Sequence, residues 1–338
     1  MEIEPKNTVK KIWVRMPNWL GDFVMALPHL RAIKAHQPEA QLTLIAKPQF
    51  KDLIELFPIA DEFVPLQKGT IRSFRELSAL GRDEKPECHV LFTNSVRGDL
   101  EAWFGGADHR VGMAYPGRYR PLLTGVYRLD AFQDELDVTH QTSLLEDFLK
   151  SFDLIDSVES TPFEFEGIER IENRVGLIAG SSNNAQKCWA VENWCCMIDA
   201  LSRKLPGVQF VLFGTENDRE ISAAVANGCS MTVRDRTGKT NMNELAKELA
   251  ACSLVVGNDT GGMHLANAVG APVAVLFGPT NPSVTGPFFD APKLCLQPEG
   301  CPREGGRSIQ LLQPETVMER LGDFLETEAK TGRRADVD

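Results

Sequence analysis

Short apolar runs alternate with helix-like stretches along the whole chain, and this alternation constrains the fold more than any other feature of the sequence. The apolar runs lie at residues 11–15, 41–45 and 87–92 in a first series, and at 175–179, 209–213, 253–256 and 272–277 in a second. Helical patterns lie at residues 22–35, 191–204, 243–251 and 262–269. Strands that alternate with helices form parallel sheets with helices on both faces. The sequence therefore predicts an α/β protein with one doubly wound sheet in each half.

An acidic stretch at residues 157–173 separates the two series and is the predicted linker. We expect a first Rossmann-like domain at 8–165, a second at 172–312, and a C-terminal helix at 314–330, followed by a frayed tail at 331–338. In doubly wound domains, loops and helix N-termini gather at the carboxyl ends of the strands. We therefore expect the two domains to face a central cleft that binds the ligands.

The composition is that of an ordinary globular protein and argues against several classes. Of the 338 residues, 43% are hydrophobic and 25% are charged. The net charge of −11 argues against a protein that binds nucleic acid, because nucleic-acid binders need a basic surface to neutralise phosphates. No apolar run reaches the ~20 residues needed to span a bilayer, and the N-terminus has no apolar signal region. We expect a cytoplasmic protein that touches a membrane at most from its surface.

The eight cysteines include no Cys-x-x-Cys pair, and reduced, buried thiols are the expected state. Cys295 and Cys301 flank a Pro- and Gly-rich loop at 297–306, to which the sequence assigns no role. No third and fourth ligand lies near these two cysteines in the sequence, so no metal site is predicted.

Three turns in the second half carry polar residues just after a predicted strand, at 180–187, 214–217 and 258–262. The first and third turns offer hydroxyls, small residues and Lys187, which suit a diphosphate bound at a helix N-terminus. The middle turn offers Glu216, whose carboxylate suits ribose hydroxyls.

Other nucleotide-binding and hydrolase motifs fail. Gly238-Lys239-Thr240 ends like a Walker A loop, but Val233 stands where that pattern requires glycine. No Gly-x-Gly-x-x-Gly follows the first strand of either half, and no Gly-x-Ser-x-Gly is present.

In the first half, Asp22 follows a turn between a predicted strand and a predicted helix. Gly21 gives that turn backbone freedom, and Asp22 stands where a carboxylate caps a helix. Spacing alone leaves two interpretations open, a helix cap and a catalytic carboxylate.

Several separated motifs resemble the ADP-heptose:lipopolysaccharide heptosyltransferases, glycosyltransferase family 9. They are the stretch from Pro17 to Pro28, Lys187-Cys188-Trp189, the stretch from Asn258 to His264, and Phe277-Gly278-Pro279-Thr280. The resemblance covers residues 8–327. Asn94-Ser95, Arg97 and the stretch 118–123 are more similar to the heptosyltransferase II branch than to heptosyltransferase I. One departure is Ala190, where the family usually has proline.

The resemblance implies a GT-B fold, with two Rossmann-like domains facing a central cleft, and an inverting transfer without a covalent intermediate. It implies that Asp22 is the general base for the acceptor hydroxyl. A helix N-terminus favours an ionised carboxylate and lowers its pKa, so Asp22 would be a weak base and proton transfer would come late.

The donor implied by the resemblance is ADP-L-glycero-D-manno-heptose. Lys187, aided by hydroxyl and backbone donors, would bind the diphosphate, while Asp259 would bind the heptose, Glu216 the ribose and Met242 the adenine. The hydroxyl and backbone donors are Ser181, Ser182, Thr260, Gly261 and Gly262. His264 would either donate to phosphate or satisfy a buried polar contact. No Asp-x-Asp pair lies in the turns that follow the predicted strands, so no cofactor is expected; a non-essential Mg²⁺ ion is left open.

The acceptor implied by the resemblance is an anionic, lipid-linked inner-core oligosaccharide on the cytoplasmic face of the inner membrane. Its predicted contacts are Asn94, Arg97, Arg118 and Arg120. The first half also carries Arg110, Arg128, Tyr115, Tyr119 and Tyr127, which together make a basic and aromatic region suited to phosphate, carboxylate and a membrane surface.

Three alternative functions stay open from the sequence: a GT-B glycosyltransferase with another donor or acceptor, a sugar-nucleotide epimerase, and a non-catalytic nucleotide-binding protein. The sequence does not decide between the heptosyltransferase I, II and III branches, nor does it fix the acceptor position or the oligomeric state.

Overall fold

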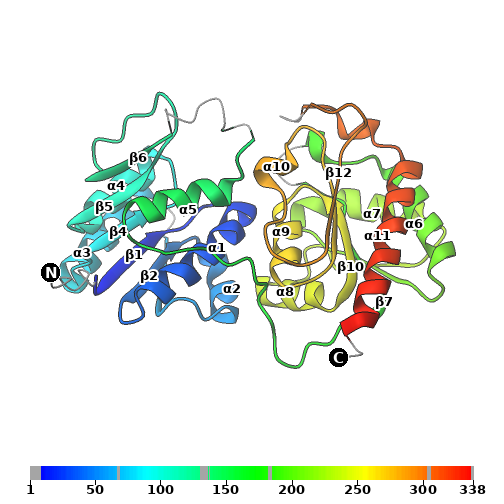
Figure 1. Ribbon diagram of the computed structural model, residues 1–338, viewed down its shortest axis with the longest axis horizontal. Helices are drawn as coiled ribbons and strands as arrows, with labels where there is room; N and C mark the ends of the chain where they lie inside the picture. The colour runs from blue at the N-terminus through cyan, green and yellow to red at the C-terminus, as the bar shows by residue number, and fades with distance from the viewer. Residues whose placement is uncertain are drawn as a thin grey trace. The chain divides into compact units, whose positions relative to one another are not determined.

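A computed structural model describes residues 9–66, 69–129, 136, 138–181, 185–302 and 306–335. The chain divides into two compact units, Met1–Glu159 and Ser160–Asp338 (Figure 1). Each unit has its own parallel sheet of six strands.

The first unit is built on the strand order β3-β2-β1-β4-β5-β6. Its strands are β1 (Lys11–Arg15), β2 (Gln41–Ala46), β3 (Glu62–Pro65), β4 (Cys88–Leu91), β5 (His109–Ala114) and β6 (Gly125–Arg128). Its helices are α1 (Leu20–His36), α2 (Lys51–Leu56), α3 (Thr70–Glu84), α4 (Val96–Gly105) and α5 (Gln141–Ser151), with the 3-10 turn η1 (Pro48–Phe50). The strand order reverses between β1 and β4, which is where doubly wound sheets bind ligands.

The second unit repeats this order as β12-β11-β10-β7-β8-β9. Its strands are β7 (Ile171–Ile178), β8 (Gln209–Leu212), β9 (Val233–Asp235), β10 (Cys252–Asn258), β11 (Val273–Leu276) and β12 (Lys293–Leu296). Its helices are α6 (Val191–Lys204), α7 (Arg219–Gly228), α8 (Met242–Ala250), α9 (Gly261–Ala268), α10 (Pro282–Thr285) and α11 (Pro314–Ala335), with the 3-10 turns η3 (Ala185–Lys187), η4 (Glu216–Asp218) and η5 (Ile309–Leu311). The strand order reverses between β7 and β10. The predicted doubly wound α/β architecture is confirmed in both units.

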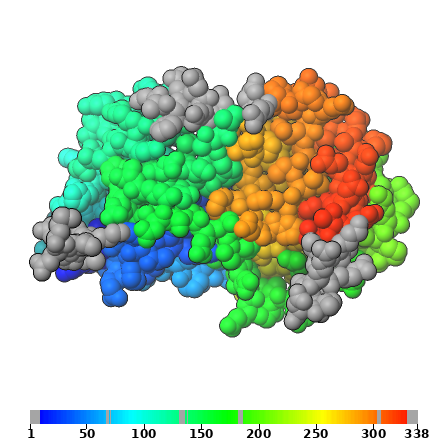
Figure 2. Space-filling view, in the orientation of Figure 1, coloured from blue at the N-terminus to red at the C-terminus, as the bar shows by residue number. Residues whose placement is uncertain are grey.

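The C-terminal helix contributes one apolar face to the core of the second unit. α11 packs on α6 and lies at the surface of this unit, in red in Figures 1 and 2. Val317 and Leu321 of α11 are fully buried in one cluster with Trp194 of α6. The helix continues to Ala335, so the prediction of a frayed tail is wrong over residues 331–335. Gly332 has the lowest helix propensity in this stretch.

His89 is a buried polar group in the core of the first unit, and it makes the stability of this unit sensitive to acid. The side chain is 0% exposed, and neither ring nitrogen has a hydrogen-bond partner among the residues that the structure describes. Its ring meets the edge of Trp13, with ring centroids 5.7 Å apart. Burial, with the nearby charges of Arg15 and Arg110, lowers the pKa of His89 from 6.5 to about 3.

We expect His89→Leu to stabilise the first unit in acid. Since the unfolded chain takes up a proton below pH 6.5 and the folded chain does so only near pH 3, stability is lost as the pH falls through this window. The variant removes this loss and two unpaired buried nitrogens, so its free energy of unfolding at pH 7 should be equal or about 1 kcal/mol higher. Urea unfolding between pH 4 and 7.5 measures both effects.

His109→Leu is the control for this test, and His29 accounts for the acid sensitivity that should remain in His89→Leu. His109→Leu removes an exposed imidazole from β5 and separates the loss of a histidine from the loss of a buried one. Burial also lowers the pKa of His29 to about 4, so some acid sensitivity should remain in His89→Leu. An unchanged pH profile in His89→Leu contradicts the assignment.

Candidate functional site

A cavity of about 290 Å³ opens at the carboxyl edge of the first sheet. It is formed by the segments that follow β1, β4 and β5, together with residues of α1 and α5. Its lining consists of Pro17, Asn18, Trp19, Asp22, Met25, Leu91, Phe92, Thr93, Asn94, Ser95, Met113, Tyr115, Gln141 and Leu145. The cavity therefore lies at the switch point between β1 and β4, where a ligand site is expected.

Asp22 lines this cavity from the first turn of α1. Asp22 is not the N-cap residue of α1, because the helix begins at Leu20 and Trp19 stands at the N-cap position. The carbonyl of Trp19 accepts the first helical hydrogen bond from the Phe23 amide at 2.9 Å. Asp22 is the third helical residue, and a carboxylate in the first turn is stabilised by the helix dipole. Burial raises the pKa of Tyr115, which also lines the cavity, and the charge of Asp22 adds to that shift.

Of the predicted acceptor residues Asn94, Arg97 and Arg118, Asn94 is among the residues that line this cavity. The Oδ1 atom of Asn94 is buried without a hydrogen-bond partner in the described part of the chain. Nε and Nη2 of the half-buried Arg118 are likewise buried without a hydrogen-bond partner in the described part of the chain. The side chain of Arg97 is 45% exposed and its Nε donates to Glu101 at 2.8 Å.

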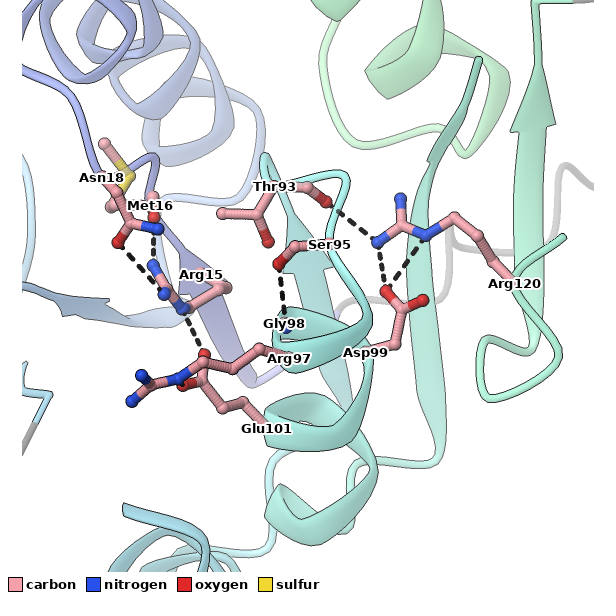
Figure 3. Close-up of polar contacts among 10 residues, drawn as sticks. All are labelled: Arg15, Met16, Asn18, Thr93, Ser95, Arg97, Gly98, Asp99, Glu101 and Arg120. Carbon is pink, nitrogen blue, oxygen red and sulfur yellow. Dashed lines mark hydrogen bonds and ion pairs between the residues drawn. The ribbon is translucent and has the colours of Figure 1, made fainter. Parts of the chain in front are cut away.

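Arg120 does not fit the predicted contact with an acceptor. Its side chain is 0% exposed, and both Nε and Nη2 donate to Oδ1 of Asp99, at 3.0 and 2.5 Å (Figure 3). Its Nη2 also donates to the Thr93 carbonyl at 2.9 Å, and its Nη1 to the Met113 carbonyl. The guanidinium therefore holds the protein's own backbone.

Arg110 has a similar structural position. It donates to the carbonyls of Leu122 and Ala107, at 2.9 and 2.5 Å, and so ties together two loops of the first unit. In contrast, Tyr119 is 76% exposed.

In the second unit, Lys187 and Asp259 meet at the carboxyl edge of the sheet. Lys187 ends η3 in the connection after β7, and Asp259 directly follows β10, so the two residues flank the switch point of this sheet. The Lys187 Nζ lies 2.6 Å from Oδ2 of Asp259. The Thr280 hydroxyl donates to the same oxygen at 2.6 Å. Asp259 is 5% exposed, so its charge is balanced locally by one ammonium and one hydroxyl.

The N-terminus of α9 adjoins this ion pair. Thr260 is its capping residue, and the Oγ1 atom of Thr260 is buried without a partner among the described residues. Gly261 and Gly262 form the first helical positions, and a Cβ on Gly262 would meet Ile178 at 2.7 Å. A helix N-terminus with an unsatisfied hydroxyl is suited to an anion. His264 lies buried in the same helix.

The remaining predicted donor residues have varied positions. Ser181 is half-buried, and Ser182 lies outside the described residues. Glu216 lies in η4, where its 66% exposed carboxylate binds Arg219 at 2.8 Å. Met242 is the first residue of α8 and is half-buried.

Two residues that the sequence analysis did not select hold the loops of this site. Asp218 accepts from the amide and hydroxyl of Thr215, and its side chain fills the space beside Gly180, where a Cβ would lie 2.2 Å from Oδ1 of Asp218. The capping pattern of Thr215 and Asp218 could have indicated this turn. Gln310 accepts from the Ala190 amide at 3.0 Å and donates to the Cys188 carbonyl at 2.6 Å. No local pattern indicates that second tie.

The described residues offer neither a metal site nor a membrane-spanning helix. Within the residues that the structure describes, no group of three or more His, Cys, Asp or Glu side chains could hold a metal ion. The eight cysteines, Cys295 and Cys301 included, are free. Of the described helices, none is long and apolar enough to cross a membrane.

Comparisons with known proteins agree with one another. The family model described as glycosyltransferase family 9 (heptosyltransferase) matches residues 87–310. The chain is 26% identical over 300 residues to lipopolysaccharide heptosyltransferase 2 of Escherichia coli (strain K12), covering 82% of this chain and 85% of the relative. It is 25% identical over 348 residues to lipooligosaccharide heptosyltransferase 2 of Haemophilus influenzae, covering 91% and 97%.

Solved structures show the same fold over nearly the whole chain. A glycosyl transferase of family 9 from Veillonella parvula superposes with a TM-score of 0.81 at 22% identity, covering 94% of this chain and 98% of that one. The E. coli ADP-heptose LPS heptosyltransferase II superposes with a TM-score of 0.78 at 24% identity, covering 94% and 99%. The predicted GT-B fold class is confirmed.

Proposed function

Because the chain belongs to glycosyltransferase family 9, we propose that it transfers a heptose from ADP-L-glycero-D-manno-heptose to the inner core of a lipopolysaccharide. The observation that carries this proposal is the match to the heptosyltransferase family model over residues 87–310, which bears out the resemblance found in the sequence. The chain is a glycosyltransferase. The relatives named heptosyltransferase 2 support the type II branch.

In this proposal the first unit binds the acceptor in the cavity at β1 and β4. Asp22 lines that cavity and is the general base. As the acceptor oxygen attacks the anomeric carbon of the heptose, the hydroxyl proton passes to the Asp22 carboxylate. The C–O bond to the β-phosphate breaks, and ADP leaves with the electron pair. Because attack and departure occur on opposite faces, the anomeric configuration inverts.

The anionic inner-core acceptor is recognised by polar groups of the same unit. Asn94 and Arg118 support this role, since each has buried polar atoms without a partner in the described chain. Such groups are costly to bury unless a bound molecule satisfies them. Arg97 adds a partly exposed cation. Arg120 is left out of this proposal because its donors already bind Asp99 and backbone carbonyls.

The second unit binds ADP-heptose at the N-terminus of α9. Lys187 and the hydroxyl and amide groups at Ser181, Thr260, Gly261 and Gly262 neutralise the diphosphate as charge develops on the leaving group. Asp259 binds heptose hydroxyls, Glu216 the ribose and Met242 the adenine. His264 donates to a phosphate oxygen. Lys187 would then exchange part of its ion pair with Asp259 for the phosphate. These donors stand in for a metal ion, so no cofactor is required.

We further propose that the enzyme works in the cytoplasm and contacts the inner membrane peripherally, because its acceptor is lipid-linked. Exposed aromatic residues near the cavity support this contact. Trp19 is 57% exposed and lines the cavity, and the ammonium of Lys47 lies 5.2 Å from its ring centroid. Aromatic rings beside cations are favoured where a protein meets an anionic headgroup layer.

Nucleotide selectivity tests this proposal first. We expect calorimetric titration to show that ADP binds more tightly than GDP or UDP, with equal affinity in Mg²⁺ and in EDTA. Heptose transfer is then followed with ADP-heptose and an inner-core lipopolysaccharide acceptor. A preference for UDP or GDP would keep the glycosyltransferase and reject the ADP-heptose donor; no transfer to the inner-core acceptor would reject the proposed acceptor.

A further inference from the structure

Helix α4 carries two buried carboxylates, Asp99 and Glu101, and each binds a different buried arginine (Figure 3). Residues two apart in an α-helix point to nearly opposite sides, since each residue turns the helix by about 100°. α4 follows β4, which lies between β1 and β5 in the sheet. The two carboxylates therefore reach in opposite directions: Glu101 binds Arg15 at the end of β1, and Asp99 binds Arg120 in the segment after β5.

The Glu101 side holds the loop that leads from β1 into α1. Glu101 is 0% exposed, and its Oε2 accepts from Arg15 Nε at 2.6 Å. The other two nitrogens of Arg15 donate to the Met16 carbonyl and, at 3.3 Å, to Oδ1 of Asn18. Asn18 lines the cavity, and Asp22 follows it in the first turn of α1. This side of the helix therefore fixes the wall that carries Asp22.

The Asp99 side holds the opposite wall. Arg120 spans from Asp99 to the carbonyls of Thr93 and Met113, and both of these residues line the cavity. Arg120 is tightly packed against β5, because a Cβ on Gly112 would lie 2.7 Å from Nη1 of Arg120. A Cβ on Gly98 would lie 2.3 Å from the Thr93 hydroxyl.

Net stability alone does not account for two buried ion pairs on one helix. Removing charges from water costs about as much as a buried pair returns, and apolar residues of similar size often serve equally well. What apolar residues cannot supply are the forked donors to Met16, Asn18, Thr93 and Met113. A planar guanidinium fixed by a carboxylate on one side presents its other donors in a defined direction.

We propose that Glu101 and Asp99 are positioning residues that set the two walls of the cavity through Arg15 and Arg120. This proposal rests on the proposed function, in that the cavity holds the acceptor. The Arg15 side sets the position of Asp22 relative to the acceptor hydroxyl and therefore acts on kcat. The Arg120 side carries no proposed catalytic group, so it acts on the KM for the acceptor.

Arg15→Lys and Arg120→Lys test the two sides. Lysine keeps a positive charge for the carboxylate but loses the fork to the backbone. We expect Arg15→Lys to lower kcat about tenfold with little change in acceptor KM, since small misplacements of reacting groups are costly. We expect Arg120→Lys to raise acceptor KM about tenfold with a smaller change in kcat. A purely structural role would lower the melting temperature of both variants without this split.

A measurement without substrates separates this proposal from the proposed function. The chain has five tryptophans, and Trp19 lies in the loop that Arg15 holds. In protein labelled with fluorotryptophan, the ¹⁹F resonance of Trp19, assigned with Trp19→Phe, should shift or broaden in Arg15→Lys. The resonances of Trp189 and Trp194 in the second unit should not move. This result is expected whether or not the wild-type enzyme transfers heptose.

Controls cover folding and nonspecific effects. Lys11→Met/Glu84→Leu removes an ion pair of 3.1 Å at the other end of β1 and should leave kcat, KM and the Trp19 resonance unchanged. If Arg15→Lys does not fold, Arg15→Met/Glu101→Leu removes both charges of this pair; because Glu101 also accepts from Arg97 Nε at 2.8 Å, this variant is judged by the Trp19 resonance and kcat, not by the acceptor KM. A Trp19 resonance that stays in place, or kcat and KM within twofold of wild type in both folded variants, overturns the proposal.

Discussion

Asp22→Asn should lower kcat for heptose transfer by about 10²–10⁴-fold, the contribution typical of a general base. The amide cannot take the proton of the acceptor hydroxyl, yet it has the size of the carboxylate and fits the first turn of α1. The affinity for ADP should not change, because the nucleotide is assigned to the second unit. Steady-state kinetics with ADP-heptose, together with calorimetric titration with ADP, measure both quantities.

Asp52→Asn is the matched control for this variant. Asp52 is also an acidic residue in the first turn of a helix of the same unit, but it does not line the cavity. Asp52→Asn removes a carboxylate near a helix N-terminus but leaves the proposed catalytic groups in place. Its kcat should therefore equal that of the wild type. If Asp22→Asn keeps kcat within about tenfold of wild type, another group accepts the proton and the assignment of Asp22 fails.

Lys187→Met is expected to have the second-largest effect, a loss of about 10²–10³-fold in kcat, as for other single donors that stabilise developing charge. The ammonium is proposed to neutralise the diphosphate as the C–O bond breaks, so its effect should be larger on kcat than on ADP affinity. An exposed lysine of the same unit provides the control, Lys247→Met in α8.

The ion pair between Lys187 and Asp259 complicates this test, and a double variant resolves it. In Lys187→Met the buried Asp259 carboxylate loses its ammonium partner and, among the described residues, keeps the hydrogen bond from the Thr280 hydroxyl. The melting temperature should therefore fall, because a buried charge is left without its counter-ion. Lys187→Met/Asp259→Asn removes the unpaired charge and should recover the melting temperature, whereas kcat stays low because the proposed ligands of the diphosphate and of the heptose are both lost. If activity returns together with stability, Lys187 acts on folding and not on the leaving group.

Much of the fold could be predicted from the sequence, because the central strands are buried on both faces and their apolar runs are nearly continuous. α6 occupies the predicted range, 191–204. The edge strands gave no such signal. β3, for example, has four residues, all exposed or half-buried, and its sequence Glu-Phe-Val-Pro contains just two residues of high strand propensity. β9, with three residues, is similar.

The candidate site was predictable where its residues lie next to one another in the chain. Asp259, Thr260, Gly261 and Gly262 follow one strand, and the structure brings Lys187 to them across the switch point. Burial was not predictable. Arg120 stands in an arginine-rich stretch that suggested a surface, and its burial depends on Asp99, 21 positions away. The cap at Asp22 failed because helix boundaries are uncertain by one or two residues.

The tie between Ala190 and Gln310 has a consequence for the history of the chain. Ala190 has φ −62°, a value that proline also adopts, so the backbone alone would accept the residue that is usual in the family. Proline has no N–H, however, and would leave the Gln310 oxygen without the donor that it now has. The effect of one replacement therefore depends on the residue already present 120 positions away. Because Gln310 is exposed, water can take the place of that donor, so a return to proline would cost about one exposed hydrogen bond and loosen the tie between these two loops.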